Sequence, residues 1–205
     1  MFHVEQFIDR FLPNLDKKLF IEKASFIERE YMKWNSAINI SSIRDINGFW
    51  LKHVLDSLCL ASYIKEVYQN YDVMDIGSGG GFPGLVLGLC LENKITMVEP
   101  IRKKTDFIDH CIRRIPLLNT KTISLKYEEI PIPTDKALIV SRALGAYDEL
   151  YNYFSKINKQ NRFVLMTTKQ QKHSFKTNLI CKHYDFINNI TNNEFKNNVL
   201  AEIIG

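Results

Sequence analysis

A glycine-dense turn between two apolar segments constrains this chain more than any other feature of its sequence. Residues 73–84 read Val-Met-Asp-Ile-Gly-Ser-Gly-Gly-Gly-Phe-Pro-Gly, with five glycines among the last eight. The apolar run 71–76 predicts a buried strand, and the almost wholly apolar residues 85–91 predict a helix between two layers, with Pro83 suited to its first position. Glycines allow positive φ and the close approach of a ligand. The turn therefore predicts a nucleoside-binding site.

A carboxylate follows the next predicted strand. Residues 94–100 form a mostly apolar run that ends in Glu99 and Pro100, and proline cannot donate to a sheet. In a parallel α/β sheet, ligands bind outside the carboxyl ends of the strands, and an acid about 20 residues after the glycines accepts hydrogen bonds from ribose hydroxyls. Each charge-assisted bond of this kind contributes roughly 1.5 to 3 kcal/mol. A lone strand-end glutamate is ordinarily solvated, but the glycine turn before it favours a ribose contact for Glu99.

The glycine pattern is compatible with two kinds of cofactor. Residues 79–84 match the G-x-G-x-x-G fingerprint of dinucleotide-binding enzymes, whereas Gly77-Ser78-Gly79 directly after Asp75 has the spacing of S-adenosylmethionine enzymes. A dehydrogenase usually adds a substrate domain to its nucleotide domain, and 205 residues leave little room for one. An NAD-dependent oxidoreductase nevertheless stays an alternative.

Length and composition predict one domain with an appendage. With 45% hydrophobic and 24% charged residues the chain is an ordinary globular protein. We expect a helical extension over residues 1–69, packed on a Rossmann-like core over residues 70–205. The charged residues Glu5, Asp9 and Arg10 argue against a signal peptide, and no apolar run is long enough to cross a bilayer. A soluble cytoplasmic protein is expected.

The four cysteines are scattered. Cys59, Cys90, Cys111 and Cys181 show no spacing typical of metal ligands or redox pairs, and most have apolar neighbours. We expect buried, reduced thiols, with no disulfide and no zinc or other metal.

The net charge of +4 is too small to indicate a polyanionic partner, but its distribution is uneven. Residues 156–184 contain seven lysines and arginines and no Asp or Glu. Such a segment either follows a phosphate backbone or forms a solvated surface balanced by acids elsewhere in the fold.

A helix predicted over residues 50–58 carries a polar patch. Its apolar residues would face inward, which places His53, Asp56 and Ser57 together on an adjacent stripe. An exposed helix face with a local His-Asp pair is the ordinary interpretation. The position directly before the glycine-turn strand suggests instead that the helix borders the site. A Ser-His-Asp nucleophile is not indicated, because the three residues lie on one helix surface.

The remaining chain predicts further strands. Residues 122–125, 137–141 and 163–167 are expected strands, and 184–190 and 199–204 are weaker candidates to complete a doubly wound sheet. The helices before residue 70 show apolar stripes, one of them Phe20, Ala24, Ile27, Tyr31 and Trp34, and we interpret these as packing surfaces.

Two of these strands are followed by candidate site residues. Tyr127 and Glu128 follow the strand at 122–125, where an adenine ring would lie, and Arg142 follows the strand at 137–141 with the reach to contact cofactor or substrate.

Four motifs in this order resemble the ribosomal RNA small subunit methyltransferase G family, formerly called glucose-inhibited division protein B. They are Asn-Ile-Ser-Ser-Ile-Arg at 39–44, His-Val-Leu-Asp-Ser-Leu at 53–58, the glycine turn at 75–84 and Ser-Arg-Ala at 141–143. The similarity covers about residues 20–170. It implies a class I S-adenosylmethionine-dependent methyltransferase fold and methylation of N7 of one guanine in 16S ribosomal RNA.

The resemblance also implies residue roles. Cofactor contacts are implied for Gly77, Gly79, Phe82, Tyr127, Glu128 and Arg142, with Glu99 at the ribose. Polar positions near the RNA entrance are implied for Arg44, His53, Asp56, Ser57 and Lys169. Glu99 stands where Asp is commoner, and Met-Thr-Thr-Lys-Gln at 166–170 departs from the family's Ala-Leu-Lys-Gly pattern, so the role of Lys169 is open.

The implied chemistry needs no acid or base. Guanine N7 has a free lone pair and no proton to lose, so methyl transfer requires alignment and exclusion of water. We expect a monomer that acts on 16S ribosomal RNA or the small ribosomal subunit, with the target base unpaired or extruded. An RNA-binding module that keeps the fold without turnover is a further alternative.

Overall fold

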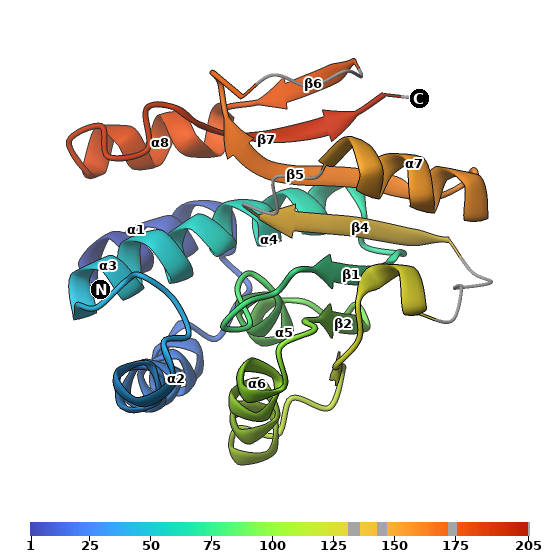
Figure 1. Ribbon diagram of the computed structural model, residues 1–205. Helices are drawn as coiled ribbons and strands as arrows, with labels where there is room; N and C mark the ends of the chain where they lie inside the picture. The colour runs from blue at the N-terminus through green and yellow to red at the C-terminus, as the bar shows by residue number, and fades with distance from the viewer. Residues whose placement is uncertain (131–135, 143–146, 172–175, 205) are drawn as a thin grey trace.

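Seven strands form one sheet with helices packed on it (Figure 1). The computed structural model describes residues 1–130, 136–142, 147–171 and 176–204. The sheet has the order β3-β2-β1-β4-β5-β7-β6. Its strands are β1 (Asp72–Ile76), β2 (Ile95–Val98), β3 (Thr120–Ile123), β4 (Ala137–Arg142), β5 (Arg162–Thr168), β6 (Thr177–Ile180) and β7 (Asn198–Ile203). The doubly wound α/β architecture expected from the sequence is confirmed.

The parallel part of the sheet places the candidate residues at one edge. β1 pairs in parallel with β2 on one side and with β4 on the other, and β3 and β5 extend this parallel arrangement. The carboxyl ends of these strands therefore share an edge, at which the chain order reverses between β1 and β4. Ligands of open α/β sheets bind at such a switch point. β7 runs antiparallel to both β5 and β6.

Two segments near the carboxyl terminus differ from the sequence prediction. The strand predicted at 184–190 is wrong, because helix α8 (Lys182–Ile190) occupies these residues and buries side chains at helical spacing. β6 was not predicted, since it is an edge strand whose two middle residues are exposed and it lacks an apolar alternation. The strand predicted at 199–204 is confirmed as β7, and β3 begins two residues before the predicted start.

Residues 1–71 are all described, and they form helices and no strand, as predicted. The elements are α1 (Phe2–Phe11), α2 (Lys17–Ile38), α3 (Ile46–Gly48), the π-helical segment η1 (Phe49–Leu55) and α4 (Asp56–Val67). Asp16 caps α2, because its carboxylate accepts the N–H of Leu19 at 3.0 Å. The predicted stripe of α2 is buried except for Trp34, which is partly buried.

The helices that follow β1 lie on two sides of the sheet (Figure 1). Besides α8, they are α5 (Gly84–Cys90), α6 (Arg102–Arg114), the 3-10 turn η2 (Tyr127–Glu129) and α7 (Tyr147–Ile157). Val73 and Met97 face a large apolar cluster that includes α1, α2, α4, α5 and α6. Met74 and Ile139 face a smaller cluster with α7. The helical extension thus shares its core with the sheet, while the division between residues 69 and 70 stays a prediction.

The four cysteines are free thiols. Cys59 and Cys111 are buried as predicted, whereas Cys90 and Cys181 are partly buried. Among the described residues, no three His, Cys, Asp or Glu side chains form a group that could hold a metal ion. Within the same residues, no helix has both the length and the apolar character needed to span a membrane.

Candidate active site

The glycine turn after β1 consists mostly of residues that have no side chain. Gly77, Gly79 and Gly81 have φ values of 73°, 59° and 83°, a region that strongly favours glycine. The N–H of Gly77 donates to the carbonyl of Val98 at 2.9 Å, which ties the turn to the end of β2. A Cβ built on Gly79 would meet no atom within 4 Å. The turn therefore has open space at Gly79, where a ligand can approach the backbone.

The carboxylate of Glu99 borders this space. Its two oxygens accept the N–H groups of Gly79 at 2.9 Å and Ile101 at 3.0 Å, and the side chain is only 4% exposed. Each carboxylate oxygen has a second lone pair, so two acceptor positions are left for hydroxyl groups. Glu99 can thus bind a ribose while it holds the turn in place.

Asp75 is a functional candidate that sequence reasoning did not name. It is fully buried near the end of β1, and its Oδ2 accepts the N–H of Gly84 at 2.9 Å. Among the described residues its Oδ1 has no hydrogen-bond partner. Burial raises the pKa of Asp75 to about 7, and the bond from Gly84 opposes this shift. An acid two residues before the first glycine of the turn was the available signal in the sequence.

The polar patch predicted on the helix at 50–58 is buried, so its interpretation as an exposed helix face is wrong. His53 is 4% and Asp56 5% exposed, and Ser57 is fully buried. The inward direction predicted for Leu55 and Leu58 is confirmed. The polar side chains are buried too, because η1 and α4 pack against α1 and α5 within the large apolar cluster. The hydroxyl of Ser57 donates to the carbonyl of His53 at 2.6 Å and is thereby engaged within the helix.

Arg142 joins the end of β4 to this helix. Its Nη2 lies 2.9 Å from Nδ1 of His53, and its Nη1 donates to the carbonyl of Lys52 at 2.7 Å. Nη1 also lies 3.5 Å from Oδ2 of Asp56. Asp56 in turn accepts the hydroxyl of Tyr184 at 2.7 Å. The structure thus brings Arg142, His53 and Asp56 together and turns the guanidinium toward the helix.

His53 is held as a neutral ring. Burial, followed by the positive charge of Arg142, lowers its pKa from 6.5 to about 2. Its ring stacks on Phe82 with centroids 4.3 Å apart and planes inclined by 12°. Phe82 also contacts Tyr31 and Phe49 edge to face and is buried, so its side chain belongs to an aromatic cluster beneath the turn.

Tyr127 and Glu128 lie in η2, after the carboxyl end of β3. The ring of Tyr127 is partly buried and packs against Tyr153 and Phe154 of α7, with centroid distances of 5.5 and 6.3 Å. Burial raises the pKa of Tyr127 to about 12, and the adjacent Glu128 adds to the shift. The side chain of Glu128 is exposed, and its carbonyl accepts the hydroxyl of Tyr153 at 3.1 Å.

The two predicted cations near the RNA entrance differ in their surroundings. Arg44 donates to the carbonyl of Asn35 at 2.7 Å and to Oδ1 of Asn39 at 2.6 Å, which fixes its guanidinium to the end of α2. Lys169 is exposed just after β5, and its backbone N–H donates to the carbonyl of Asn197 at 2.8 Å.

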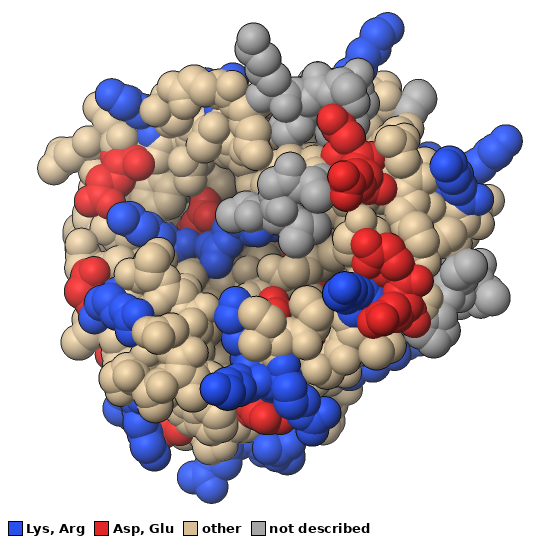
Figure 2. All heavy atoms as spheres, in the orientation of Figure 1, with Lys and Arg blue, Asp and Glu red and all other residues tan. Residues whose placement is uncertain are grey.

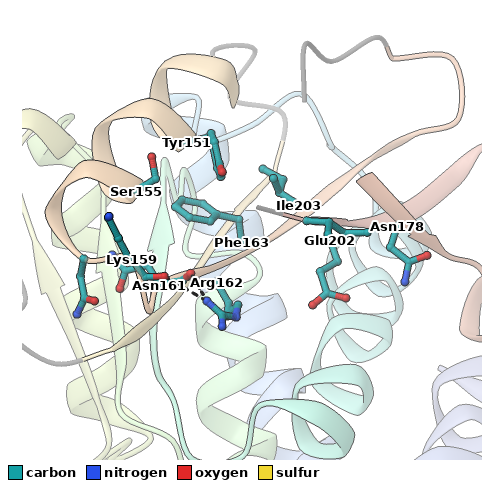
Figure 3. A pocket seen from close by; sticks show the side chains of 11 residues that line it. Tyr151, Ser155, Lys159, Asn161, Arg162, Phe163, Asn178, Glu202 and Ile203 are labelled. Atoms are coloured by element: carbon teal, nitrogen blue, oxygen red, sulfur yellow. Dashed lines mark hydrogen bonds between the residues drawn. The ribbon is translucent and has the colours of Figure 1, made fainter. Parts of the chain in front are cut away.

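The basic segment 156–184 does not form one surface. Lys169 lies at the carboxyl edge of the parallel strands, whereas Lys159 and Arg162 line a hollow of about 530 Å³ at the opposite edge (Figure 3). Lys182 is paired with Glu66, and Lys172 lies outside the described residues. On the face shown in Figure 2, Lys and Arg side chains also gather over the region of α2 and α6. Only some of the cations of residues 156–184 therefore lie at the carboxyl edge of the parallel strands, where the candidate site is.

The sequence did not predict the hydrogen-bonded group around Tyr31 in the helical extension. Tyr31 was interpreted as an apolar packing residue, and it is buried as predicted, but its hydroxyl contacts Ser41, His53 and the carbonyl of Ile43. A tyrosine in place of phenylalanine on a buried stripe was the signal, because a buried phenol needs a partner.

Comparison with known proteins identifies similar sequences and folds. A family model described as rRNA small subunit methyltransferase G matches residues 21–196. A ribosomal RNA small subunit methyltransferase G from Rickettsia felis is 34% identical over 151 residues, covering 73% of this chain and 75% of the relative. Its counterpart from Rickettsia prowazekii is 34% identical over 149 residues, with the same coverage.

A solved structure supports the fold. A SAM-dependent methyltransferase from Aquifex aeolicus aligns with a TM-score of 0.52 and 14% identity, over 81% of this chain and 97% of that one. At this identity the similarity concerns the fold alone. It confirms the class I methyltransferase fold that the sequence predicts.

Proposed function

The chain belongs to the rRNA small subunit methyltransferase G family, and on that premise we propose that it transfers the methyl group of S-adenosylmethionine to N7 of one guanine in 16S ribosomal RNA. The observation that carries this proposal is the pairing of an open glycine turn at Gly79 with the buried carboxylate of Glu99. S-adenosylmethionine needs both features. Its ribose hydroxyls require hydrogen-bond acceptors, and its amino-acid tail requires a backbone that it can approach closely.

The cofactor contacts follow from these residues. Gly77 and Gly79 present backbone to the cofactor, and Glu99 accepts its ribose hydroxyls. Phe82 contributes through its backbone, since its ring is buried against His53. Tyr127 and Glu128 lie after β3 and flank the adenine.

The chain's own residues act by alignment. When bound, S-adenosylmethionine supplies an electrophilic methyl group on a sulfonium. Because guanine N7 offers a lone pair and no proton, the protein has only to hold the two reactants in line and exclude water. His53 fits this account, because it is neutral and both of its ring nitrogens have partners. We propose Arg142, His53 and Asp56 as positioning residues and assign no general acid or base.

The RNA approaches from the carboxyl edge. Lys52 and Lys169 are exposed cations at this edge, and Arg44 presents a fixed guanidinium there. We propose that they hold phosphates around an unpaired or extruded guanine. Ser57 supports this edge through its bond to His53. We further propose a cytoplasmic monomer with an extension over residues 1–69 and a core over 70–205, acting on 16S ribosomal RNA or the small ribosomal subunit.

Two measurements test the function. Incubation of the full chain with labelled S-adenosylmethionine and small-subunit RNA, followed by mapping of the modified nucleotide, is expected to give one N7-methylguanine. Labelling at another base or atom would overturn the proposed target. Calorimetric titration with S-adenosylhomocysteine and with NAD separates the rivals. Binding of NAD alone would favour an oxidoreductase, and RNA binding without methyl transfer would favour a non-catalytic module.

A further inference from the structure

The hydroxyl of Tyr31 links the helical extension to the side chains around Arg142. Tyr31 lies in α2 and is completely buried. Its oxygen lies 3.0 Å from the carbonyl oxygen of Ile43, 2.6 Å from Oγ of Ser41 and 3.2 Å from Nε2 of His53. These partners come from two separate segments, the loop after α2 and the helical segment η1. The phenol is therefore the point at which both segments meet.

The geometry determines where the protons lie. The carbonyl of Ile43 can only accept, so Tyr31 donates its single proton there. The guanidinium of Arg142 has only donors, so Nδ1 of His53, at 2.9 Å, is the acceptor of the ring. The ring proton consequently lies on Nε2 and is donated to the oxygen of Tyr31. The hydroxyl of Ser41 donates the second bond that the phenol accepts.

The opposite tautomer would break this arrangement at two points. With the proton on Nδ1, an N–H of His53 would face the N–H groups of Arg142. Nε2 would then need a donor. Either Tyr31 would have to withdraw its proton from Ile43, or the hydroxyl of Ser41, 3.4 Å from Nε2, would have to give up its 2.6 Å bond to Tyr31 for this longer one. Stacking on Phe82 also restricts the ring of His53. The phenol of Tyr31 therefore favours the tautomer that accepts from Arg142.

Arg142 lies where such control matters for the site. It directly follows Ser141, which pairs with Ile76 at the end of β1, so Arg142 emerges from the sheet next to Gly77. Its guanidinium is held by His53 and by the carbonyl of Lys52.

We propose that Tyr31 is a positioning residue: its hydroxyl holds His53 with the proton on Nε2, and His53 thereby fixes the guanidinium of Arg142 beside the glycine turn. The effect on methylation rests on the proposed function. The tautomer itself does not depend on it.

The test compares two tyrosine-to-phenylalanine substitutions in the full chain. Tyr31→Phe removes the hydroxyl that contacts His53. Tyr63→Phe removes a hydroxyl that donates to Glu202 at 2.8 Å, beside the hollow at the opposite edge of the sheet (Figure 3). Tyr31→Phe loses the bonds to Ile43, Ser41 and His53, whereas Tyr63→Phe loses one bond, so Tyr31→Phe should lose the larger part of the unfolding free energy. The two variants are therefore compared at the site and not by stability. Only Tyr31→Phe should change the site.

Three readouts separate positioning from general stability. Nitrogen-15 NMR of the histidine rings should show wild-type His53 protonated on Nε2, unchanged in Tyr63→Phe and shifted or mixed in Tyr31→Phe. The calorimetric dissociation constant for S-adenosylhomocysteine should rise roughly fivefold in Tyr31→Phe, as expected when the bond between Tyr31 and His53 is lost, and stay constant in Tyr63→Phe. In a His53→Gln background, where no tautomer can change, Tyr31→Phe should have little further effect on this constant.

The proposal is overturned if wild-type His53 carries its proton on Nδ1, or if Tyr31→Phe matches Tyr63→Phe in all three readouts. Should Tyr31→Phe fail to fold, the wild-type spectrum alone still supports or overturns the tautomer assignment. If the wild-type chain neither binds S-adenosylhomocysteine nor methylates RNA, the proposed function fails, while the NMR comparison still decides the role of Tyr31.

Discussion

The carboxylate of Glu99 accepts the backbone N–H of Gly79 at 2.9 Å and so joins the end of β2 to the turn after β1. The same carboxylate accepts from Ile101, which leaves its two remaining lone pairs for a ligand. One side chain thus supports the turn and forms part of the crevice. Replacing the carboxylate of Glu99 should therefore weaken cofactor binding more than it lowers the free energy of unfolding.

Glu99→Gln should weaken S-adenosylhomocysteine binding by about tenfold or more, because a charge-assisted acceptor is replaced by an amide whose NH₂ faces backbone N–H groups. Calorimetry measures the change. Glu92→Gln is the matched control, since Glu92 is exposed in the loop before β2, at the opposite end of that strand, and it should bind within about twofold of wild type. Equal losses in both variants would contradict the role of Glu99.

Gly80→Ala should lower the melting temperature, because its Cβ would lie 2.4 Å from Cγ2 of Ile40 in the loop that packs on the turn. Such crowding typically costs about 1 to 3 kcal/mol. Calorimetric unfolding should show partial recovery in the double variant Gly80→Ala, Ile40→Ala. Absence of coupling between the two positions would contradict the contact.

Gly79→Ala should behave differently. Its Cβ meets no protein atom, so only the strain of φ 59° lowers stability, by about 1 to 2 kcal/mol. The methyl group would instead occupy the space assigned to the cofactor. We expect a larger loss of S-adenosylhomocysteine affinity than in Gly80→Ala. The reverse order would place the cofactor elsewhere.

The buried neutral His53 should make the protein less stable in acid. Its folded pKa of about 2 lies below the unfolded value of 6.5, so between these values the unfolded chain binds a proton that the folded chain does not. Stability from this group is complete above pH 6.5 and is lost as the pH falls, by up to about 2 kcal/mol near pH 5. Urea unfolding of wild type and His53→Gln measures this contribution. The difference between their unfolding free energies should not change with pH above neutral pH. If the unfolding free energies of wild type and His53→Gln changed equally with pH, His53 would not titrate in this way.

Lys169→Ala should weaken RNA binding, while S-adenosylhomocysteine binding stays unchanged. The slope of the logarithm of the RNA-binding constant against the logarithm of the salt concentration should become shallower by about one unit. Lys159→Ala is the matched control from the same basic segment, because Lys159 lies at the opposite edge of the sheet. Fluorescence anisotropy with small-subunit RNA over a salt series measures both. A larger effect of Lys159→Ala would move the RNA to the other edge.

Sequence patterns predicted the parallel sheet well, since β1, β2 and β4 are short and mostly apolar. They missed β6, because an exposed edge strand carries no apolar alternation, and they misassigned α8, whose buried residues follow a helical spacing within a mixed composition. For the site, spacing placed Glu99 correctly beside the glycine turn. It could not show that His53 and Asp56 are buried, because their burial depends on packing between segments far apart in the chain.

The most direct test of the central claim is a crystal structure of the full chain with S-adenosylhomocysteine. We predict the ribose hydroxyls within hydrogen-bond distance of Glu99 and the amino-acid tail along Gly77 and Gly79. A ligand bound away from this turn, or a turn closed by protein atoms at saturating ligand, would contradict the assignment.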